Sequence, residues 1–377
     1  MVLAPPRREA PGVAEVLRSA RDQSLISDRL HPQQRKVLHR ICVCRTAALG
    51  GHADLCLDCG VESYSYNSCR DRHCPRCQWR AQEQWIEGQL KRLIDTHYFH
   101  VVFTLPAQLR PLAARNPAEI YGVLMRTASR TLLELGKTEL GATLGVTTVL
   151  HTWTRELAYH PHVHCLVTGG GLSLDRQHWR SARTKYLFAV KQMGALFRGK
   201  FLAGLRKLFD ADELNGIGAR HFDELLEVIY RADWVVYAKR PMAGPAQVIK
   251  YLGRYTHRVA ISNSRIVEAT LTHVTFITKN AQHKTLAIGD FARRFLQHVL
   301  PYGFTKIRHY GLFASPQKLA MAKQLRPPAC SEEHSEPALA SVPVCEVCGS
   351  CRLRRTPIAR TVWARGPPHD TKFGRAS

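Results

Sequence analysis

The sequence predicts an α+β protein with a small metal-binding module near its N-terminus. Between residues 98 and 315, apolar runs typical of strands mix with patterns typical of helices. Most of the 12 cysteines fall between Cys42 and Cys77, in a stretch with little aliphatic content. Lys and Arg number 54 against 30 Asp and Glu, a formal charge of +24. A chain of 377 residues is long enough for a sizeable core, which excludes global disorder.

The elements are placed by apolar periodicity and by the residues that flank them. Tyr98–Leu105 reads YFHVVFTL, an apolar run that predicts a buried strand. A helix is expected from Pro117, which suits a first turn, to Gly136, which suits an end. The strand His162–Thr168 is expected to stop at glycines 169–171, which force a turn. The other predicted helices cover 79–93, 186–209, 221–230, 245–258 and 290–300. The other predicted strands cover 144–153, 234–238, 259–262, 269–278 and 306–314.

These patterns divide the chain into four consecutive regions. An N-terminal helical segment, 1–40, precedes a Cys-rich module that a metal is expected to hold together, 41–95. A mixed α+β domain of the size of a catalytic domain follows over 96–320, and the remainder, 321–377, is a tail with a Cys cluster. The tail is rich in Pro, Ala, Ser and Glu and then basic, so we expect it to be poorly ordered.

The positive charge predicts a polyanionic partner, of which nucleic acid is the commonest. A basic surface without any nucleic-acid role is the alternative. No apolar run approaches the roughly 18 residues of a membrane helix, and the N-terminus lacks the apolar core of a signal peptide. We therefore expect a cytoplasmic, nucleoid-associated protein, in a reducing compartment where clustered Cys-x-x-Cys pairs bind zinc rather than form disulfides.

Two Cys-x-x-Cys pairs, Cys56/Cys59 and Cys74/Cys77, each offer two thiolates to one tetrahedral zinc ion. Zinc is favoured over an iron–sulfur cluster because histidines lie among the cysteines. Eight side chains would suffice for two sites, although their pairing is open and several could instead be buried free thiols. The candidate zinc ligands are Cys44, His52, Cys56, Cys59, Cys69, His73, Cys74 and Cys77.

Basic and aromatic residues accompany this cluster. Arg70, Arg72 and Arg76 lie among the cysteines, and Tyr64 and Tyr66 precede them. Cations and rings on a rigid metal-bound scaffold suit phosphate contacts and base stacking, and a solvated charged face is the alternative. In the tail, three further cysteines form an incomplete site unless Cys330 or His334 completes it, or are free thiols. These three are Cys345, Cys348 and Cys351.

A second constellation is the segment His160-Pro161-His162-Val163-His164. Residues two apart on a strand share a face, so His162 and His164 point the same way. Two imidazoles on an apolar strand are costly unless they bind a metal or are hydrogen-bonded. Such nitrogens can hold a divalent ion and leave positions for a phosphate oxygen. His160 is a candidate third ligand if the strand extends past Pro161, although that ligand could come from elsewhere.

A third constellation is the tyrosine pair Tyr251 and Tyr255, spaced i and i+4 on the predicted helix 245–258. This spacing places both hydroxyls on one helix face. A tyrosine hydroxyl can attack phosphorus and form a covalent intermediate that preserves the phosphodiester energy. Basic side chains within the same helix supply positive charge for a phosphate, namely Lys250, Arg254 and Arg258. Simple packing of an amphipathic helix is the alternative.

Taken in order, NSCRDRHCPRCQ, HPHVHCLVTGGGL, YLGRYTHRVAIS and KIRHYGLFA resemble rolling-circle transposases of the insertion-sequence-91 type. These belong to the two-tyrosine group of His-hydrophobic-His (HUH) single-strand endonucleases. The resemblance covers about residues 40–315. It implies a ferredoxin-like HUH core with the histidines on a central strand, and an N-terminal zinc module that binds DNA.

The resemblance also implies roles for single residues. His162 and His164 would bind the catalytic ion, Mg²⁺ or Mn²⁺, and Tyr251 and Tyr255 would be the paired nucleophiles. The implied activity is transposition by cleavage and strand transfer of single-stranded DNA, at the ends of a mobile element and at its target. A replication initiator or relaxase with the same chemistry, and a non-catalytic zinc-containing DNA-binding regulator, are the alternatives.

Overall fold

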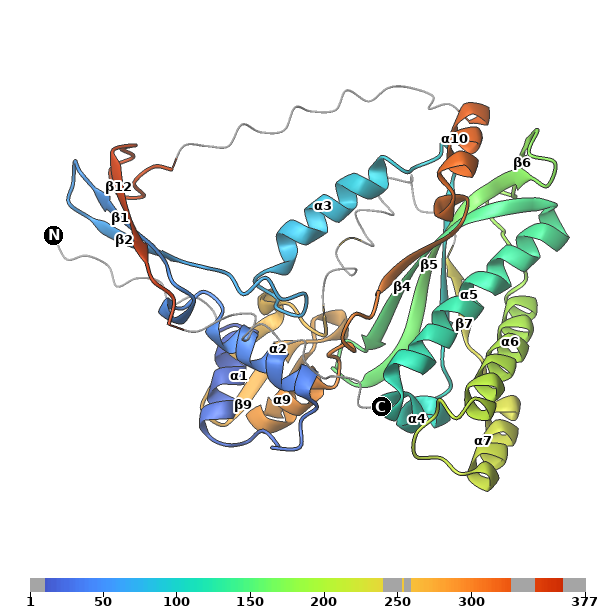
Figure 1. The fold of residues 1–377 in the computed structure, drawn as a ribbon, viewed down its shortest axis with the longest axis horizontal. Helices are drawn as coiled ribbons and strands as arrows, with labels where there is room; N and C mark the ends of the chain where they lie inside the picture. Colours follow the sequence, from blue (N-terminus) through green and yellow to red (C-terminus); the bar gives the residue numbers. More distant parts are fainter. Residues whose placement is uncertain (1–10, 240–252, 254–258, 327–342, 362–377) are drawn as a thin grey trace, which may run out of the picture. The chain divides into compact units, whose positions relative to one another are not determined.

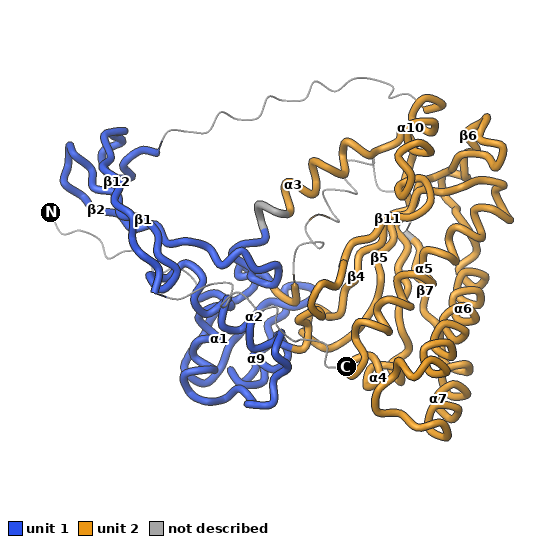
Figure 2. Tube along the Cα trace, in the orientation of Figure 1, with its two compact units in different colours: residues 1–79, 262–296, 332–377 blue, residues 80–261, 297–331 orange. Residues whose placement is uncertain are grey.

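The computed structural model describes residues 11–239, 253, 259–326 and 343–361. The chain forms two compact units, shown in Figure 2. Unit 1 comprises 1–79, 262–296 and 332–377, and unit 2 comprises 80–261 and 297–331. Each unit is therefore built from segments that are far apart in the sequence, whereas the composition predicted four consecutive regions.

Unit 2 is organised around one antiparallel sheet with the strand order β11-β4-β5-β3-β7 (Figure 1). A short strand, β6, pairs with β5 outside this path. The long strand β5 is central and pairs with both β4 and β3. An antiparallel sheet combined with helices confirms the α+β prediction. The strands are β3 (Tyr98–Thr104), β4 (Ala142–Trp153), β5 (Tyr159–Ser173), β6 (Trp179–Ser181), β7 (Val236–Lys239) and β11 (Ile307–Gly311).

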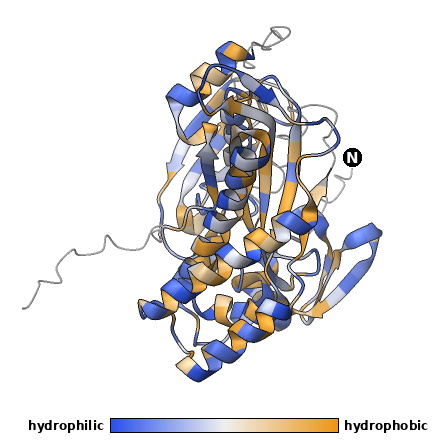
Figure 3. Ribbon diagram, turned by 90° about the vertical axis from the view of Figure 1, so that its right-hand side faces the viewer, coloured by the Kyte–Doolittle hydropathy of each residue, from blue (hydrophilic) through white to orange (hydrophobic). Residues whose placement is uncertain are grey.

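Helices cover one face of this sheet, with α5 packed against β4 and α6 against α5 (Figure 1). Alternate residues of β5, namely Val163, Cys165 and Val167, enter the main core on this side. Apolar residues recur along the strands of the sheet (Figure 3). The helices described in or entering unit 2 are α3 (Gln78–Leu90), α4 (Arg110–Arg115), α5 (Pro117–Leu140), α6 (Val190–Asp210), α7 (Ala219–Arg231) and α10 (Pro316–Leu325).

The opposite face of the sheet carries a smaller apolar cluster that includes Tyr98 and Leu166. Since side chains alternate along a strand, the neighbours of Leu166 two and four positions earlier, His164 and His162, share this second face. The sheet therefore separates a fully apolar core from a face that presents imidazoles.

Unit 1 contains two three-stranded sheets, β12-β1-β2 and β10-β9-β8. Part of the predicted tail is thus a strand, because β12 pairs antiparallel with β1. The strands are β1 (Gly51–Cys56), β2 (Glu62–Tyr66), β8 (Ile266–Ala269), β9 (His273–Ile277), β10 (His283–Ala287) and β12 (Leu353–Ile358). The helices are α1 (Val13–Asp22), α2 (Pro32–Val43) and α9 (Ile288–Leu296). No helix in the described ranges is long and apolar enough to cross a bilayer.

Glycines account for two differences from the predicted elements. The helix that begins at Pro117 continues past Gly136 and ends at Gly141, which has a left-handed φ of 61°. Gly136 lies inside the helix, and the Leu144 side chain packs directly against it. A Cβ at Gly136 would lie only 2.7 Å from Leu144 Cγ. The glycines at 169–171 do not turn the chain, since β5 runs on to Ser173. A Cβ at Gly169 would overlap the His97 ring, and a Cβ at Gly170 or Gly171 would overlap the backbone of a neighbouring strand.

A third difference concerns the run Val259–Ser262, which was predicted as a strand and forms none. Its apolar side chains are buried, but Ala260 has a φ of 58°, and the Ile261 amide donates to the Val259 carbonyl at 2.7 Å. Burial of a short apolar run therefore occurs here in a tight turn, which periodicity alone cannot distinguish from a strand.

Candidate metal centres and nucleic-acid interface

Three histidines converge on the second face of the unit 2 sheet. His151 on β4 pairs directly with His162 on β5, and His164 pairs with Val149 two residues before His151. One ligand nitrogen from each of the three lies within 4.8 Å of the others. Ring centroids are 4.2 Å apart for His151 and His164, and 5.0 Å apart for His162 and His164. The register of the β4–β5 pair alone thus assembles the cluster.

Hydrogen bonds determine which nitrogen each ring keeps for a ligand. His162 Nδ1 lies 2.6 Å from the His160 carbonyl oxygen, so it donates there and leaves Nε2 with a lone pair. His164 Nδ1 lies 2.7 Å from Nε2 of His100, a buried residue of β3. For His164 to bind an ion, its Nδ1 must donate in this pair, which leaves its Nε2 with the lone pair. Partners of this kind orient metal-binding imidazoles and increase their affinity.

The environment of His162 keeps its ring in the form that binds a metal. Burial lowers the pKa of His162 to about 4, and the nearby His160 and His100 act in the same direction. His162 is therefore neutral at pH 7, as a ligand must be.

His160, the candidate third ligand, lies outside this cluster. Its Nδ1 accepts a hydrogen bond from Arg110 Nη2 at 2.9 Å. The cluster has His151 in its place. Sequence reasoning missed His151, although pairing the two predicted strands as a hairpin would have placed it opposite His162.

The predicted nucleophiles Tyr251 and Tyr255 lie outside the described residues, as do Lys250, Arg254 and Arg258. Gly253, midway between the tyrosines, is described: it is helical and buried. A Cβ at this position would lie 2.5 Å from side-chain carbons of Ile86 on α3. The chain at residue 253 therefore approaches α3 closely.

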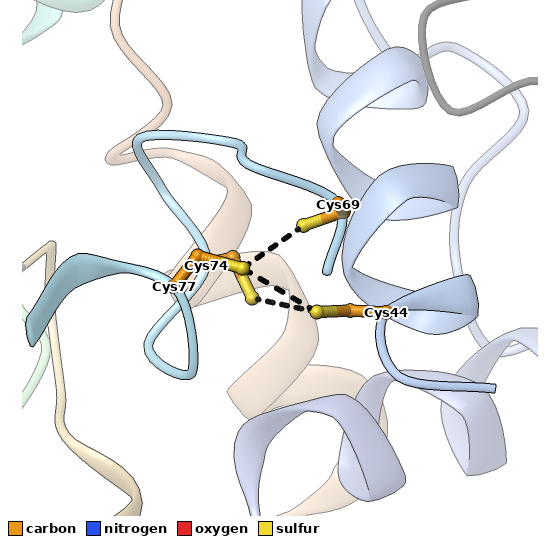
Figure 4. Close-up of side chains that lie close together, drawn as sticks. All are labelled: Cys44, Cys69, Cys74 and Cys77. Carbon is orange, nitrogen blue, oxygen red and sulfur yellow. Dashed lines mark hydrogen bonds between the residues drawn. The ribbon is translucent and has the colours of Figure 1, made fainter. Parts of the chain in front are cut away.

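Four cysteines of unit 1 face one another, as Figure 4 shows for Cys44, Cys69, Cys74 and Cys77. Sγ of Cys44 lies 3.5 Å from Sγ of Cys77 and 3.6 Å from that of Cys74. Sγ of Cys69 lies 3.6 Å from that of Cys77. A tetrahedral zinc ion with Zn–S bonds of about 2.3 Å requires sulfur atoms about 3.8 Å apart. Hydrogen bonds from Cys44, Cys69 and Cys74 hold the pKa of Cys77 far below its usual value, which favours the thiolate.

The two predicted histidine ligands of this module lie outside both cysteine clusters. His73 is buried, and its Nδ1 is 2.9 Å from Asp71 Oδ1, while Asp71 also pairs with Arg40 at 3.0 Å. His73 therefore stabilises the loop that carries the cysteines. His52 lies four residues before Cys56 on β1, which separates their Cα atoms by about 13 Å along the strand. That distance is too long for one ion.

Cys56 and Cys59 instead lie beside two cysteines of the tail, Cys345 and Cys348. One ligand atom from each of the four lies within 4.8 Å of the others. More than 280 residues separate the two pairs in the chain, and neither short motif indicates which other pair shares its ion.

The predicted DNA-binding arginines of this module differ in their surroundings. Arg70 and Arg72 are exposed. Arg76 forms an ion pair with Glu15 of α1 at 2.8 Å and so helps to hold the module together. On β2, the Tyr64 and Tyr66 rings lie 6.5 Å apart and nearly parallel, with Tyr64 exposed.

Comparison with known proteins adds two family matches. Residues 145–320 match the family described as "Putative transposase", and residues 16–105 match the "Transposase zinc-binding domain". The three-histidine cluster lies in the first range and the four-cysteine cluster of Figure 4 in the second.

Two relatives are similar over most of the chain. The chain is 43% identical to "Putative transposase y4qJ" of Sinorhizobium fredii, over 84% of this chain and 85% of that protein. It is 30% identical to the "Transposase for insertion sequence element IS801" of Pseudomonas savastanoi pv. phaseolicola, over 73% of this chain and 69% of that protein.

Among solved structures, "Conjugative Relaxase Trwc In Complex With Orit DNA. Metal-Bound Structure" matches 42% of this chain and 70% of its own at 17% identity, with a TM-score of 0.24. We draw no functional conclusion from a structural match at that level.

Proposed function

The chain belongs to the insertion-sequence-91 type of transposases, and we propose that it moves a DNA element by cutting and rejoining single strands through tyrosine intermediates, by a rolling-circle route. The observation that carries this chemistry is the cluster of His151, His162 and His164. Three imidazoles on adjacent strands, two of them with a hydrogen-bonding partner behind the ring, form a site for a divalent ion.

The residues present suit such an ion and favour one choice. Imidazole nitrogen is a poor ligand for Mg²⁺, which prefers oxygen, whereas Mn²⁺ accepts nitrogen more readily. We therefore expect Mn²⁺ to support the reaction at lower concentration than Mg²⁺. When bound, the ion supplies Lewis-acid polarisation of the scissile phosphate.

The nucleophiles in this proposal are Tyr251 and Tyr255, one for each strand transfer. The tyrosine oxygen forms a bond to phosphorus, the bond from phosphorus to the 3′ oxygen breaks, and that oxygen leaves as a hydroxyl. The product is a 5′-phosphotyrosine, which a later 3′-hydroxyl attacks to release the tyrosine. Positive charge near the phosphate is assigned to Lys250, Arg254 and Arg258.

Zinc in this proposal supports DNA binding rather than chemistry. Cys44, Cys69, Cys74 and Cys77 hold one structural ion, because four thiolates leave no open position for substrate. The exposed Arg70 and Arg72 contact phosphates from the module that this ion stabilises. The partners are single-stranded DNA at the element's ends and target DNA in the nucleoid, so we place the protein in the cytoplasm.

The test is cleavage of single-stranded oligonucleotides that carry the flanks of the protein's own gene, with Mn²⁺ titrated from zero. His164→Ala should abolish cleavage and leave the zinc bound by the cysteines unchanged. A matched control is His221→Ala, an exposed histidine of α7, which should cleave as the wild type does. Full cleavage by His164→Ala, or cleavage that persists with no divalent ion, would contradict the assignment of the cluster.

A further inference from the structure

We propose that Cys56, Cys59, Cys345 and Cys348 hold a second structural zinc ion, which fastens the C-terminal strand β12 to the N-terminal hairpin β1–β2. The matched zinc-binding family region ends at residue 105, so Cys345 and Cys348 lie far outside it. The inference depends on the metal content of unit 1 and not on the chemistry proposed for unit 2.

The sulfur geometry fits one ion. Sγ of Cys56 lies 3.5 Å from Sγ of Cys348, and Sγ of Cys59 lies 3.6 Å from Sγ of Cys345. These separations are close to the roughly 3.8 Å edge of a tetrahedron of thiolates around zinc. They are far longer than a disulfide bond of about 2.05 Å.

Both pairs have the same local structure. Each reads Cys-x-x-Cys-Gly, and the glycines, Gly60 and Gly349, have φ values of 72° and 73°. The Gly60 amide donates to the Cys56 carbonyl at 3.0 Å, and the Gly349 amide donates to the Cys345 carbonyl at 2.9 Å. Two such knuckles facing each other provide the four ligands of a closed zinc site.

Amide groups inside each knuckle also point at its first sulfur. The backbone amides of Cys59 and Asp58 lower the pKa of Cys56. The backbone amides of Cys348 and Val347 likewise lower the pKa of Cys345. Hydrogen bonds of this kind stabilise a thiolate, the form in which cysteine binds zinc.

Contacts that do not involve a metal hold the two knuckles side by side. β12 pairs with β1 along its length, and Leu353 pairs with Cys56 at the end nearest the knuckles. Arg355 donates to both carboxylate oxygens of Asp54, at 2.7 and 2.9 Å. Arg352 donates to Asp58 at 2.6 Å. The four sulfurs are therefore brought together by the fold of the sheet itself.

The sheet β12-β1-β2 buries little apolar surface that could stabilise it without a metal. β2 is exposed over four of its five residues, and β12 over its four central residues. A three-stranded sheet with so little apolar burial is marginal in water, and small domains of this kind commonly depend on a metal. A zinc ion at its end would supply that stability.

Metal content tests the inference directly. The measurement is made in a His164→Ala background, so that the histidine cluster does not retain zinc. In that background, full-length protein purified under reducing conditions with zinc should contain two zinc ions per chain. The double variant Cys345→Ser/Cys348→Ser should contain one, and so should Cys74→Ser/Cys77→Ser. Combining all four substitutions should remove both. The matched control Cys351→Ser changes an exposed cysteine of the same segment that lies in neither cluster, and should keep two.

Alkylation gives a second readout that does not need the variants to fold. In zinc-loaded wild type, Cys345 and Cys348 should resist iodoacetamide while Cys351 reacts, and a chelator should remove the difference. Two zinc ions in Cys345→Ser/Cys348→Ser, or equal alkylation of all three cysteines before the chelator is added, would overturn the proposal. Either outcome leaves DNA cleavage by unit 2 as a separate question.

Discussion

His164 illustrates how a single ring nitrogen can decide the chemistry of the histidine cluster. Its Nδ1 lies 2.7 Å from Nε2 of His100, so we assign its Nε2 to the ion that the cluster would hold. His100 does not belong to the cluster of three ligand atoms, and we infer that it positions His164. The sequence marks His100 only as one residue of an apolar strand, because its partner lies 64 positions away.

The first prediction concerns His100→Ala. Loss of a hydrogen-bond partner behind a metal ligand typically reduces metal affinity roughly 10- to 100-fold. The Mn²⁺ concentration for half-maximal DNA cleavage should rise by that factor, while the rate at saturating Mn²⁺ stays near that of the wild type. An unchanged Mn²⁺ titration, with the His221→Ala control also unchanged, would show that His100 has no positioning role.

The second prediction concerns pH and His298, a fully buried residue of unit 2 that lies near the carbonyl of Leu157. Burial lowers its pKa from 6.5 to about 3. Between these values the unfolded chain binds a proton that the folded chain does not, so stability must fall as the pH falls. The contribution of His298 should be about 2 to 3 kcal/mol between roughly pH 7.5 and 4.5, at about 1.4 kcal/mol per pH unit.

His298→Gln should reduce this dependence. The free energy of unfolding, measured with urea at several pH values, should decline less steeply on acidification in the variant than in the wild type. The comparison of slopes holds even if the variant is less stable at every pH. Parallel curves would mean that His298 takes up a proton in the folded protein at the same pH as in the unfolded chain.

At the scale of elements, the strands and helices with clear periodicity could be predicted from the sequence. Tyr98–Leu105 and the predicted helices 79–93 and 221–230 correspond to β3, α3 and α7. The prediction was wrong at these glycines because a glycine in the sequence has two possible meanings. It can mark the end of a helix or strand, or a position where another part of the chain packs too closely for a side chain. Only the tertiary contacts of Gly136 distinguish the two roles.

The third prediction uses that distinction. Gly136→Ala should destabilise the protein by about 1 to 3 kcal/mol, because its Cβ would overlap Leu144. Gly199 is the matched control: it lies exposed on α6, and a Cβ there meets no atom within 4 Å. Gly199→Ala should stabilise the protein by up to about 1 kcal/mol through helix propensity. Thermal unfolding of the two variants should move in opposite directions, and a common direction would refute the contrast.

The fourth prediction concerns the exposed face of β2. The near-parallel rings of Tyr64 and Tyr66 suit stacking with bases of a single strand. Tyr64→Ala should weaken binding of single-stranded DNA by roughly 5- to 150-fold, the usual effect of losing one stacking ring. Tyr302→Ala, an exposed tyrosine in unit 2, should bind normally. Equal affinities for the two variants would exclude this face from the DNA site.

At the scale of the whole molecule, short motifs could be recognised in the sequence, whereas the residues from other parts of the chain that lie beside them in the fold could not. The zinc module, the histidine strand and the tyrosine pair were all visible as short patterns. The contributions of His151 and of Cys345 and Cys348 were not, because they depend on strand pairing across a hairpin and across more than 280 residues. Short motifs are local, whereas a complete ligand set is a property of the fold.

In the proposed mechanism, a tyrosine becomes covalently joined to DNA. The most direct measurement is an SDS-resistant protein–DNA adduct, formed with single-stranded DNA from the flanks of the gene and Mn²⁺. Wild type should form the adduct, and Tyr251→Phe, Tyr255→Phe or their combination should lose it, with the single variants showing which tyrosine acts first. An adduct that persists in Tyr251→Phe/Tyr255→Phe would contradict the account.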